Sequence, residues 1–342
     1  MTIKMLVFDY KESEQKFFAE NNFRNYDIKF FNQSLNQETF NNLSDDEKFQ
    51  TSVISVFSDS TLTEEIIDGF KNLRTIATRA NHWDNVSKKI CQKKHIAVLN
   101  IPNYGKTSVA EFTIGLILSL IRKIPQAVDG IKNQTYMNES YVGKELKNMT
   151  LGIIGVGAVG SEVCRIASAF GTKILACDIC PKKEIENKYN IEYVSMENLL
   201  KNSDIITLHI PYNGINYHMF GKEQFEKMKQ GSYFINVSQG ELINHSDLKH
   251  YLENRKLAGA ALDVVSCITE CEKCQKLSEK LEETSLLCLK DSRIIRELSH
   301  MPNVIITPQI ATETTDAIHH ILNETFYALQ DQVSGGNSHQ VI

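Results

Sequence analysis

Residues 151–160 constrain the fold more than any other part of the sequence, because an apolar run leads directly into a Gly-x-Gly-x-x-Gly pattern. The run predicts a buried strand, and a helix is expected to open at Ser161. Gly155 would permit the tight turn, Gly157 would let the backbone approach a pyrophosphate, and Gly160 would let helix and strand pack closely. We therefore predict a dinucleotide-binding strand–turn–helix unit.

The phosphate site of this unit is expected at the helix amino terminus, where Ala158 and Val159 lie and where free N–H groups and the positive helix dipole face an anion. The next predicted strand ends in Asp178, about twenty residues on, where an acid would hold the ribose hydroxyls. A carboxylate there repels a 2′-phosphate, so NAD is favoured over NADP. Lys182 and Lys183 follow closely and weaken that preference.

Strand-like and helix-like segments alternate on both sides of the glycine pattern, which is typical of parallel sheets covered on both faces. At 342 residues the chain is too long for one compact core. We predict an α/β protein with two Rossmann-like, doubly wound parallel-sheet domains. The predicted strands are 3–8, 26–31, 52–57, 73–78 and 96–99 in the first series, and 151–154, 173–177, 205–209, 233–237, 258–262 and 304–307 in the second.

Composition excludes several classes of protein. Hydrophobic residues make up 42% and charged residues 23%, as in ordinary globular chains. The formal charge of −5 lacks the basic field that dominates nucleic-acid affinity, so no nucleic-acid partner is expected. No apolar stretch is long enough for a membrane span. Eight cysteines without a signal sequence indicate free thiols and a cytoplasmic location.

The segment 108–123 predicts a helix that is apolar almost all round. Such a helix is buried either in a large core or in the interface of a homodimer, and the sequence leaves both open. A further helix is expected at 312–330, and the small polar residues 334–338 are expected to form a flexible end.

Several motifs together resemble the D-isomer-specific 2-hydroxyacid dehydrogenase family, most closely its D-lactate dehydrogenase branch. They extend over nearly the whole chain and comprise residues 103–111, 209–211 with 216–219, 228–244, 259–264 and 301–308. The resemblance implies an NAD-dependent oxidoreductase acting on a small 2-hydroxy or 2-oxo acid. It also implies a homodimer through the 108–123 helix.

The resemblance further implies a split outer domain, 1–102 plus 308–342, that carries substrate and catalytic residues, with the NAD-binding domain 103–307 inserted and the active cleft where the two meet. Ile210, Pro211 and Asn216 would lie beside the cofactor's ribose and adenine. Val237 and Ser238, in the strand and loop that end at the family's arginine position, would also contact the cofactor. Asp263 would hold the nicotinamide amide.

The chain departs from the family at its three catalytic positions. The family uses an arginine to bind the substrate carboxylate, a histidine to donate the proton and a glutamate to keep that histidine protonated. Here Gln239 stands at the arginine position and Gln309 at the histidine position. Ile268 stands at the glutamate position, and Glu270 lies two residues further on. Glutamine carries no charge and exchanges no proton near neutral pH, so ordinary 2-oxo acid reduction is doubtful.

Substitute groups are available in the sequence. His82, Tyr104 and Lys106 could form a different acid and anion-binding set, with His82 standing where the family usually has a glycine. The alternative is that His82 and Trp83 only pack at a strand-to-helix turn. Five further histidines are expected to lie in loops or surface helices and to be structural: His209, His245, His300, His319 and His320.

Cys267, Cys271 and Cys274 form a Cys-x3-Cys-x2-Cys run, with Cys288 further on. The run occupies the loop in which the family keeps its catalytic glutamate, so a metal or Fe–S cluster there would replace the chemistry. The same spacing is one face of a helix, which explains the cysteines as core residues without metal. The second explanation is favoured.

Three functions therefore remain open. The first is an NAD-dependent oxidoreductase with an altered active site, acting on a substrate unlike simple 2-oxo acids. The second is a non-catalytic NAD(H)-binding sensor or scaffold. The third is a metal or Fe–S protein built on the cysteine loop.

Overall fold

The computed structural model describes residues 2–21, 23, 25–80, 82–135, 141–264 and 283–342, with side chains between 283 and 290 left out. These residues form two compact units, the first from 1–104 and 313–342 and the second from 105–312. Residues 308–312 belong to the second unit, whereas the boundary predicted from sequence lay at 308.

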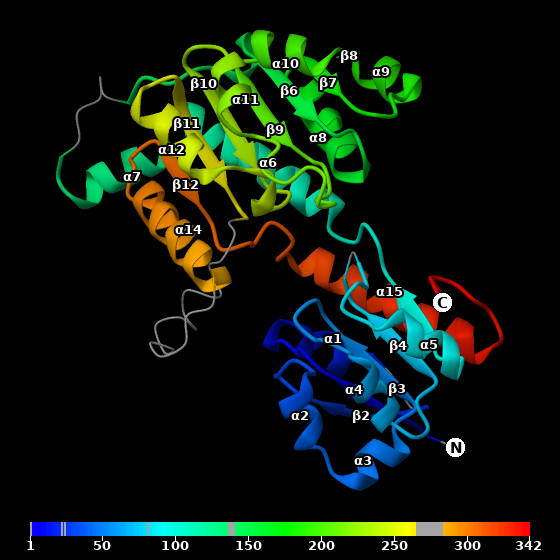
Figure 1. Ribbon diagram of the computed structural model, residues 1–342. Coiled ribbons are helices and arrows are strands. Elements are labelled where there is room, and N and C mark those ends of the chain that lie inside the picture. The colour runs from blue at the N-terminus through cyan, green and yellow to red at the C-terminus, as the bar shows by residue number, and fades with distance from the viewer. Residues whose placement is uncertain (1, 22, 24, 81, 136–140, 265–282) are drawn as a thin grey trace. The chain divides into compact units, whose positions relative to one another are not determined.

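The first unit is built on a five-stranded parallel sheet with the order β2-β1-β3-β4-β5 (Figure 1). Its strands match the predicted runs to within two residues at each end. Strands buried on both faces read as nearly continuous apolar runs, which is why the sequence locates them well. They are β1 (Ile3–Val7), β2 (Tyr26–Phe30), β3 (Val53–Val56), β4 (Thr75–Thr78) and β5 (Ala97–Asn100).

Helices cover both faces of this sheet. On one face Met5 and Val7 of β1 pack with Phe326 of α15 (Thr315–Val333). On the other face Leu6 and Phe8 belong to a second core. The helices that surround the sheet are α1 (Gln15–Glu20), α2 (Gln37–Asn41), α3 (Asp45–Gln50), α4 (Glu64–Gly69), α5 (Lys88–Lys94) and α15.

Residues 334–342 are hydrogen-bonded to this unit, so the prediction of a flexible end at 334–338 is wrong. The Asp331 carboxylate accepts a hydrogen bond from the Ser338 N–H at 2.9 Å. Residues 339–342 then run antiparallel to β5, with the Val341 N–H donating to the Val98 carbonyl at 2.8 Å. Main-chain pairing with a sheet edge satisfies polar groups whatever the side chains, so composition did not reveal it.

The second unit contains a seven-stranded parallel sheet with the order β8-β7-β6-β9-β10-β11-β12 (Figure 1). This is the doubly wound order: successive strands are added on one side of β6 as far as β8, and from β9 onward on its other side. The strands are β6 (Thr150–Ile154), β7 (Lys173–Cys177), β8 (Ile191–Tyr193), β9 (Ile205–Leu208), β10 (Ser232–Asn236), β11 (Leu257–Leu262) and β12 (Val304–Ile306). The sequence missed β8, because it is three residues long and has the exposed Glu192 at its centre.

The helix expected at 108–123 is α6 (Lys106–Ile121), and it lies in the core. Its buried residues Ile114, Ile117 and Leu120 belong to the cluster that contains β6 and α8 (Ala158–Ala169). The next helix, α7 (Ile124–Lys132), differs because it exposes apolar side chains. The other helices of this unit are α9 (Lys183–Tyr189), α10 (Met196–Asn202), α11 (Lys222–Lys227), α12 (His245–Glu253) and α14 (Glu283–Ser299).

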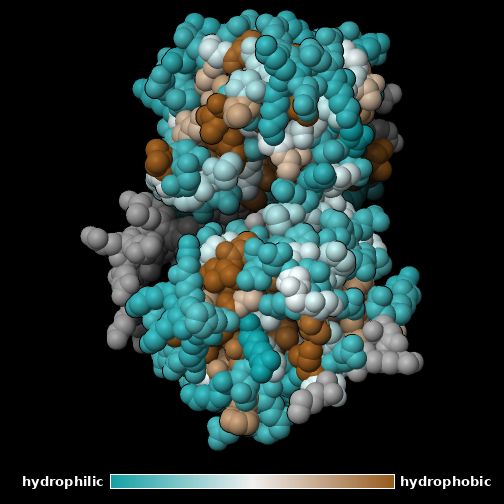
Figure 2. All heavy atoms as spheres, turned by 90° about the vertical axis from the view of Figure 1, so that its right-hand side faces the viewer, coloured by the Kyte–Doolittle hydropathy of each residue, from teal (hydrophilic) through white to brown (hydrophobic). Residues whose placement is uncertain are grey.

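Figure 2 shows one face of the molecule, on which hydrophobic residues form separate patches among hydrophilic ones. None of the described helices combines the length and the hydropathy that a bilayer crossing requires.

Candidate functional site

The candidate site lies along the carboxyl edge of the seven-stranded sheet. Ligands of doubly wound sheets bind outside the carboxyl ends of the strands, where the strand order reverses. Here that point lies between β6, which runs into the glycine loop, and β9, which runs into His209. β7, β10, β11 and β12 place further polar residues at the same edge: Asp178, Gln239, Asp263 and Gln309.

The glycine loop has the geometry of a phosphate cradle. Gly155 has φ +89°, and a Cβ there would lie 2.4 Å from the carbonyl oxygen of His209. A Cβ on Gly160 would lie 2.0 Å from the carbonyl oxygen of Gly155. By contrast, a Cβ on Gly157 would meet nothing within 4 Å. Gly155 and Gly160 are therefore required by packing, whereas Gly157 leaves open space in front of the helix.

That open space faces the start of α8, whose N-cap residue is Gly157. The first N–H groups of a helix have no acceptor within the helix, and the helix dipole makes this end positive. The predicted residues Ala158 and Val159 occupy the first turn of α8. The residues present thus fit a bound pyrophosphate.

Asp178 follows β7 and is anchored to the glycine loop. One carboxylate oxygen accepts the Val156 N–H at 2.5 Å, and the other accepts the Cys180 N–H at 2.7 Å. These bonds fix the carboxylate beside the loop, at the position where dinucleotide-binding folds use an acid to hold the ribose. The neighbouring Ile179 is fully exposed and offers an apolar surface next to it.

The loop after β9 combines an apolar pair with an asparagine turn. Ile210 and Pro211 follow His209 directly, and the Asn216 side-chain amide donates to the Pro211 carbonyl at 2.9 Å. The Asn216 side-chain oxygen accepts the Asn213 N–H at 3.0 Å. Asn216 is therefore a residue that shapes the loop.

A buried asparagine organises the loop after β10. The Asn236 side chain accepts the Ser238 N–H at 3.0 Å and donates to the Gln239 carbonyl at 2.8 Å. Ser238 donates its hydroxyl proton to the Leu208 carbonyl of β9 at 2.7 Å. Val237 is buried between them, and Gln239 is half-buried. The position that resembles the family's arginine is thus held firmly and carries an amide.

Asp263 holds the loop that carries Gln309. It is 2% exposed, and its carboxylate accepts hydrogen bonds from the Thr307 hydroxyl at 2.6 Å, the Ile310 N–H at 3.0 Å and the Ala311 N–H at 2.9 Å. The Gln309 N–H donates to the Asp263 carbonyl at 2.8 Å. This anchoring role is additional to the nicotinamide contact expected from the sequence.

The backbone of Gln309 has φ +56°, in the left-handed region that residues other than glycine seldom adopt. Such a conformation costs about 1–3 kcal/mol and persists only where the surrounding structure enforces it. The hydrogen bonds to Asp263 supply that enforcement. The Gln309 side chain is exposed at the carboxyl edge.

His209 lies in the loop that follows β9, as the sequence predicted, and it packs beneath the glycine loop, half-buried as a residue. Its Nε2 lies 3.0 Å from the Thr207 hydroxyl, and its Nδ1 is buried without a partner among the described residues. Burial lowers the pKa of His209 to about 3, so the ring is neutral at physiological pH. His245 is likewise buried, on α12, where burial lowers its pKa to about 4. The side chains that bury these rings are distant in the chain, so no local pattern revealed them.

The substitute residues divide between the two units. His82 is exposed in the first unit, and its Nδ1 lies 4.0 Å from an Asp84 carboxylate oxygen. Trp83 packs against the core on the α4 and α5 side of the sheet, which agrees with the packing interpretation for that residue. Tyr104 also belongs to the first unit and packs beside α15, whereas Lys106 opens α6 in the second.

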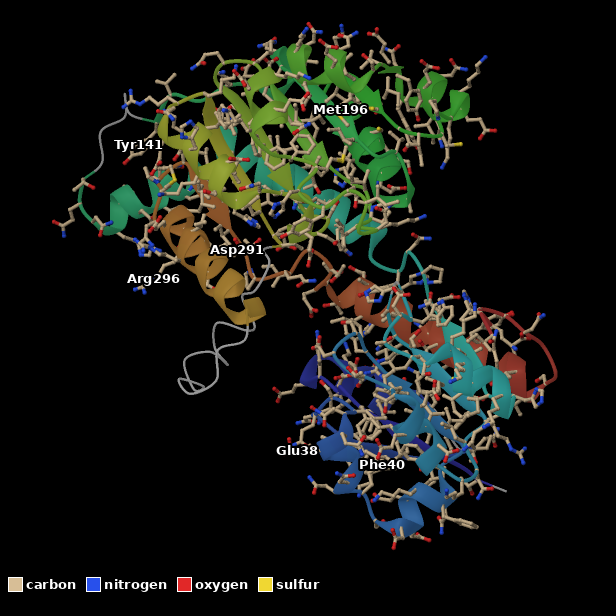
Figure 3. The ribbon with its side chains drawn as sticks, in the orientation of Figure 1. Glu38, Phe40, Tyr141, Met196, Asp291 and Arg296 are labelled. Atoms are coloured by element: carbon tan, nitrogen blue, oxygen red, sulfur yellow. The ribbon has the colours of Figure 1, made fainter. Side chains whose placement is uncertain are left out.

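The cysteine run and Glu270 lie outside the described residues, as does Ile268. Cys288 falls within α14, a helix on which Asp291 and Arg296 are labelled in Figure 3. Cysteines 91, 164, 177 and 180 are free thiols. Among the described residues, no cluster of three or more His, Cys, Asp or Glu side chains could hold a metal.

Residues 114–311 match the family model described as "D-isomer specific 2-hydroxyacid dehydrogenase, NAD binding domain". The aromatic 2-oxoacid reductase of Clostridium sporogenes is 37% identical over 281 residues, covering 81% of this chain and 82% of the relative. The hydroxypyruvate reductase of Thermotoga maritima is 34% identical over 268 residues, covering 78% and 80%.

Two solved structures are similar over nearly the whole chain. One is D-lactate dehydrogenase from Aquifex aeolicus complexed with NAD and lactic acid, with a TM-score of 0.79 and 30% identity, covering 97% of this chain and 96% of that one. The other is D-lactate dehydrogenase with NAD+ from Lactobacillus jensenii, with a TM-score of 0.82 and 27% identity, covering 99% of each chain.

Proposed function

The chain belongs to the D-isomer-specific 2-hydroxyacid dehydrogenase family, a family of NAD-binding oxidoreductases, and from this premise we propose that it binds NAD(H) but reduces ordinary 2-oxo acids only weakly. The second unit serves as the NAD-binding domain and the first as the outer, substrate-side domain. The observation that carries the proposal is the loop that contains Gln309. Asp263 holds this loop in place, yet the side chain that the loop presents, Gln309, exchanges no proton.

NAD(H) is held by the residues of the carboxyl edge. The open space at Gly157 and the first turn of α8 receive the pyrophosphate. Asp178 accepts hydrogen bonds from the adenosine ribose, and the exposed Ile179 supports the adenine together with Ile210. When bound, the cofactor supplies a hydride acceptor or donor. The protein must supply the proton and the charge that a keto oxygen requires.

Those two requirements are met poorly by amides. A missing general acid typically costs about 10²–10⁴ in rate. A missing preorganised donor at the developing oxyanion costs roughly 3 kcal/mol. The two losses are not additive within one catalytic unit. Gln239 and Gln309 can each donate a neutral hydrogen bond to a substrate and so orient it. Such a bond suits a substrate whose group beside Gln239 is not a carboxylate. The substrate is therefore a hydroxy or oxo compound unlike pyruvate.

The test is a paired measurement on one preparation. NADH binding is followed by fluorescence, and NADH oxidation is followed against a panel of 2-oxo acids. We expect binding together with turnover at least about 10²-fold below that of an active family member. Turnover at a family-typical rate would overturn the proposal.

A restoration variant sharpens the test. Gln239→Arg combined with Gln309→His returns both charged side chains to the loops that Asn236 and Asp263 hold. We expect this double variant to gain at least about tenfold in 2-oxo acid reduction, because the loop backbones need not move. The matched control is Gln330→His, which adds a histidine at an exposed position of α15 in the first unit and should gain nothing.

The sensor or scaffold function stands as the second candidate, because neither Gln239 nor Gln309 can exchange a proton. Binding of NADH without turnover on any panel substrate, by both the wild type and the double variant, would favour it. Turnover by the wild type on any substrate would instead make His82, Tyr104 and Glu270 the first residues to mutate as proton donors.

We also propose a homodimer, with α7 rather than the buried face of α6 providing the contact. Ile124, Val128 and Ile131 are exposed at spacings of four and three residues, so they line one side of α7. A single-sided apolar stripe on the surface is typical of an interface between proteins.

A further inference from the structure

A cavity of about 640 Å³ opens in the first unit, at the edge of the sheet opposite to the carboxyl ends. It lies where the five strands begin, since Ile3, Tyr26, Val53, Thr75 and Ala97 are the first residues of β1 to β5. Its size falls in the range of pockets that hold small organic molecules. None of its lining residues belongs to the NAD(H) site, which lies in the second unit.

The floor of this cavity is a row of small side chains in register. Val53 pairs with Thr75, and Thr75 pairs with Ala97. Side chains alternate between the faces of a strand, so these three point to the same side as Ala77 and Leu99, which pack in the core beside α15. α15 ends at Val333, and its last turn walls the cavity with Leu329, Gln332 and Val333.

The cavity carries positive charge without a counter-charge. The positive charge is that of the Arg74 guanidinium; His95 also lines the cavity, and no lining residue is acidic. Among the residues that the structure describes, no carboxylate lies within ion-pair distance of Arg74. An exposed guanidinium at the mouth of a pocket offers a planar, forked donor that matches a carboxylate.

The neutral polar groups are also oriented as donors. The Thr75 hydroxyl donates to the Gln332 side-chain oxygen at 2.7 Å, which occupies that oxygen and leaves the Gln332 NH₂ group for another acceptor. Burial raises the pKa of Tyr26, so its hydroxyl stays protonated. The remaining surface, from Ile3, Val53, Leu329 and Val333, is apolar. A ligand that satisfies both parts has an anionic head and an apolar body.

We propose that this cavity is a second binding site, for a small carboxylate that carries an apolar, ring-sized body. Arg74 binds the carboxylate with support from His95 and Gln332. The apolar body lies on the row Val53, Thr75 and Ala97. A polyanion such as a nucleotide is a poor fit, because a single arginine faces a mainly apolar wall.

The experiment is isothermal titration calorimetry of the full chain, saturated with NADH, using 3-phenylpropionate as the probe. We expect saturable binding of one equivalent outside the NAD(H) site. The uncharged 3-phenylpropanamide should bind at least about tenfold more weakly, because it loses the charge-assisted hydrogen bond to the arginine. Acetate should also bind at least about tenfold more weakly, because it lacks the apolar group.

Variants assign the binding to this cavity. Arg74→Gln should weaken 3-phenylpropionate binding at least about tenfold, and Ala97→Leu should abolish it by filling the floor. Arg255→Gln, an equivalent change of an exposed arginine in the second unit, should leave the affinity unchanged, as should Gln239→Ala at the carboxyl edge. Thermal melts check folding, and Arg74→Gln alone decides the matter if Ala97→Leu does not fold.

The proposal is overturned if 3-phenylpropionate fails to bind at millimolar concentration, or if Arg74→Gln binds it like the wild type. Loss of binding in Gln239→Ala but not in Arg74→Gln would place the probe at the carboxyl edge and would equally overturn it. None of these outcomes depends on whether the protein reduces 2-oxo acids.

Discussion

Replacing Asp263 by asparagine removes the anchor of the 307–311 loop while keeping the size of the side chain. The carboxylate is 2% exposed and accepts hydrogen bonds from the Thr307 hydroxyl and from the N–H groups of Ile310 and Ala311. An asparagine offers one oxygen and one NH₂ group. Two of the three donors therefore keep an acceptor, and the third faces another donor.

The expected loss of stability follows from these three bonds. Hydrogen bonds to a charged acceptor contribute about 1.5–3 kcal/mol each and neutral ones about 0.5–1.5 kcal/mol, so the two retained bonds lose about 1 kcal/mol each. The buried donor left unsatisfied costs about 1–3 kcal/mol more. Removing a buried negative charge offsets part of this. We expect a net local loss of about 3 kcal/mol.

Amide hydrogen exchange measures this loss where it occurs. A loss of about 3 kcal/mol corresponds to exchange about 10²-fold faster at Ile310 and Ala311, if the amides exchange through local opening. Peptides from β6 should keep their wild-type exchange. The matched control is Asp129→Asn, which changes an exposed aspartate on α7 and should alter neither region.

Exchange at Ile310 and Ala311 that is unchanged in Asp263→Asn would refute this reasoning. It would mean that the loop is held by its own backbone and that the three hydrogen bonds contribute little. Faster exchange throughout the second unit would instead show that Asp263 supports the whole sheet.

Three further predictions concern the cofactor, the interface and pH. Gly157→Ala places a methyl group in the open space before α8, so NADH should bind at least about tenfold more weakly by fluorescence titration, with an unchanged melting temperature. Val128→Asp on α7 should halve the mass measured by light scattering; a wild type that is already monomeric would contradict the proposed dimer. Burial lowers the pKa of His209 to about 3 and that of His245 to about 4, below the 6.5 of an unfolded chain, so the unfolded state takes up protons first and stability falls as the pH drops from 6.5 toward 4. The double variant His209→Gln with His245→Gln should flatten this slope in urea unfolding between pH 7 and pH 5, each ring contributing at most about 1.4 kcal/mol per pH unit.

Most strands could be located from the sequence, because parallel strands covered on both faces consist of nearly continuous apolar residues. The same rule failed at β8, where Ile191 and Tyr193 flank an exposed glutamate. It also failed at residues 339–342, which join β5 through main-chain hydrogen bonds that do not depend on side-chain type.

The sequence predicted those parts of the site whose residues are close in the chain, but not those formed by residues that are distant in the chain. The glycine loop and Asp178 follow one another in the chain, so spacing alone indicated a nucleotide site. The anchor at Asp263 joins it to Thr307 and Ala311, which are 44 and 48 residues away. The burial of His209 likewise depends on the glycine loop, which precedes it by about fifty residues. Contacts of this kind have no periodic signature.

The split construction of the first unit sets the order in which the chain can fold during synthesis. Met5, Val7 and Leu99 are made early, but their cover, which includes Ile321, Leu322 and Phe326, arrives only after the entire second unit. At ribosomal rates of about 5–20 residues per second, the intervening stretch of about 200 residues leaves this face of the nascent sheet without α15 for roughly 10–40 s, with only the α1 side of it covered. The contiguous second unit can complete its core in that interval. During that interval the half-covered sheet exposes apolar surface, which is where an incompletely folded chain can aggregate.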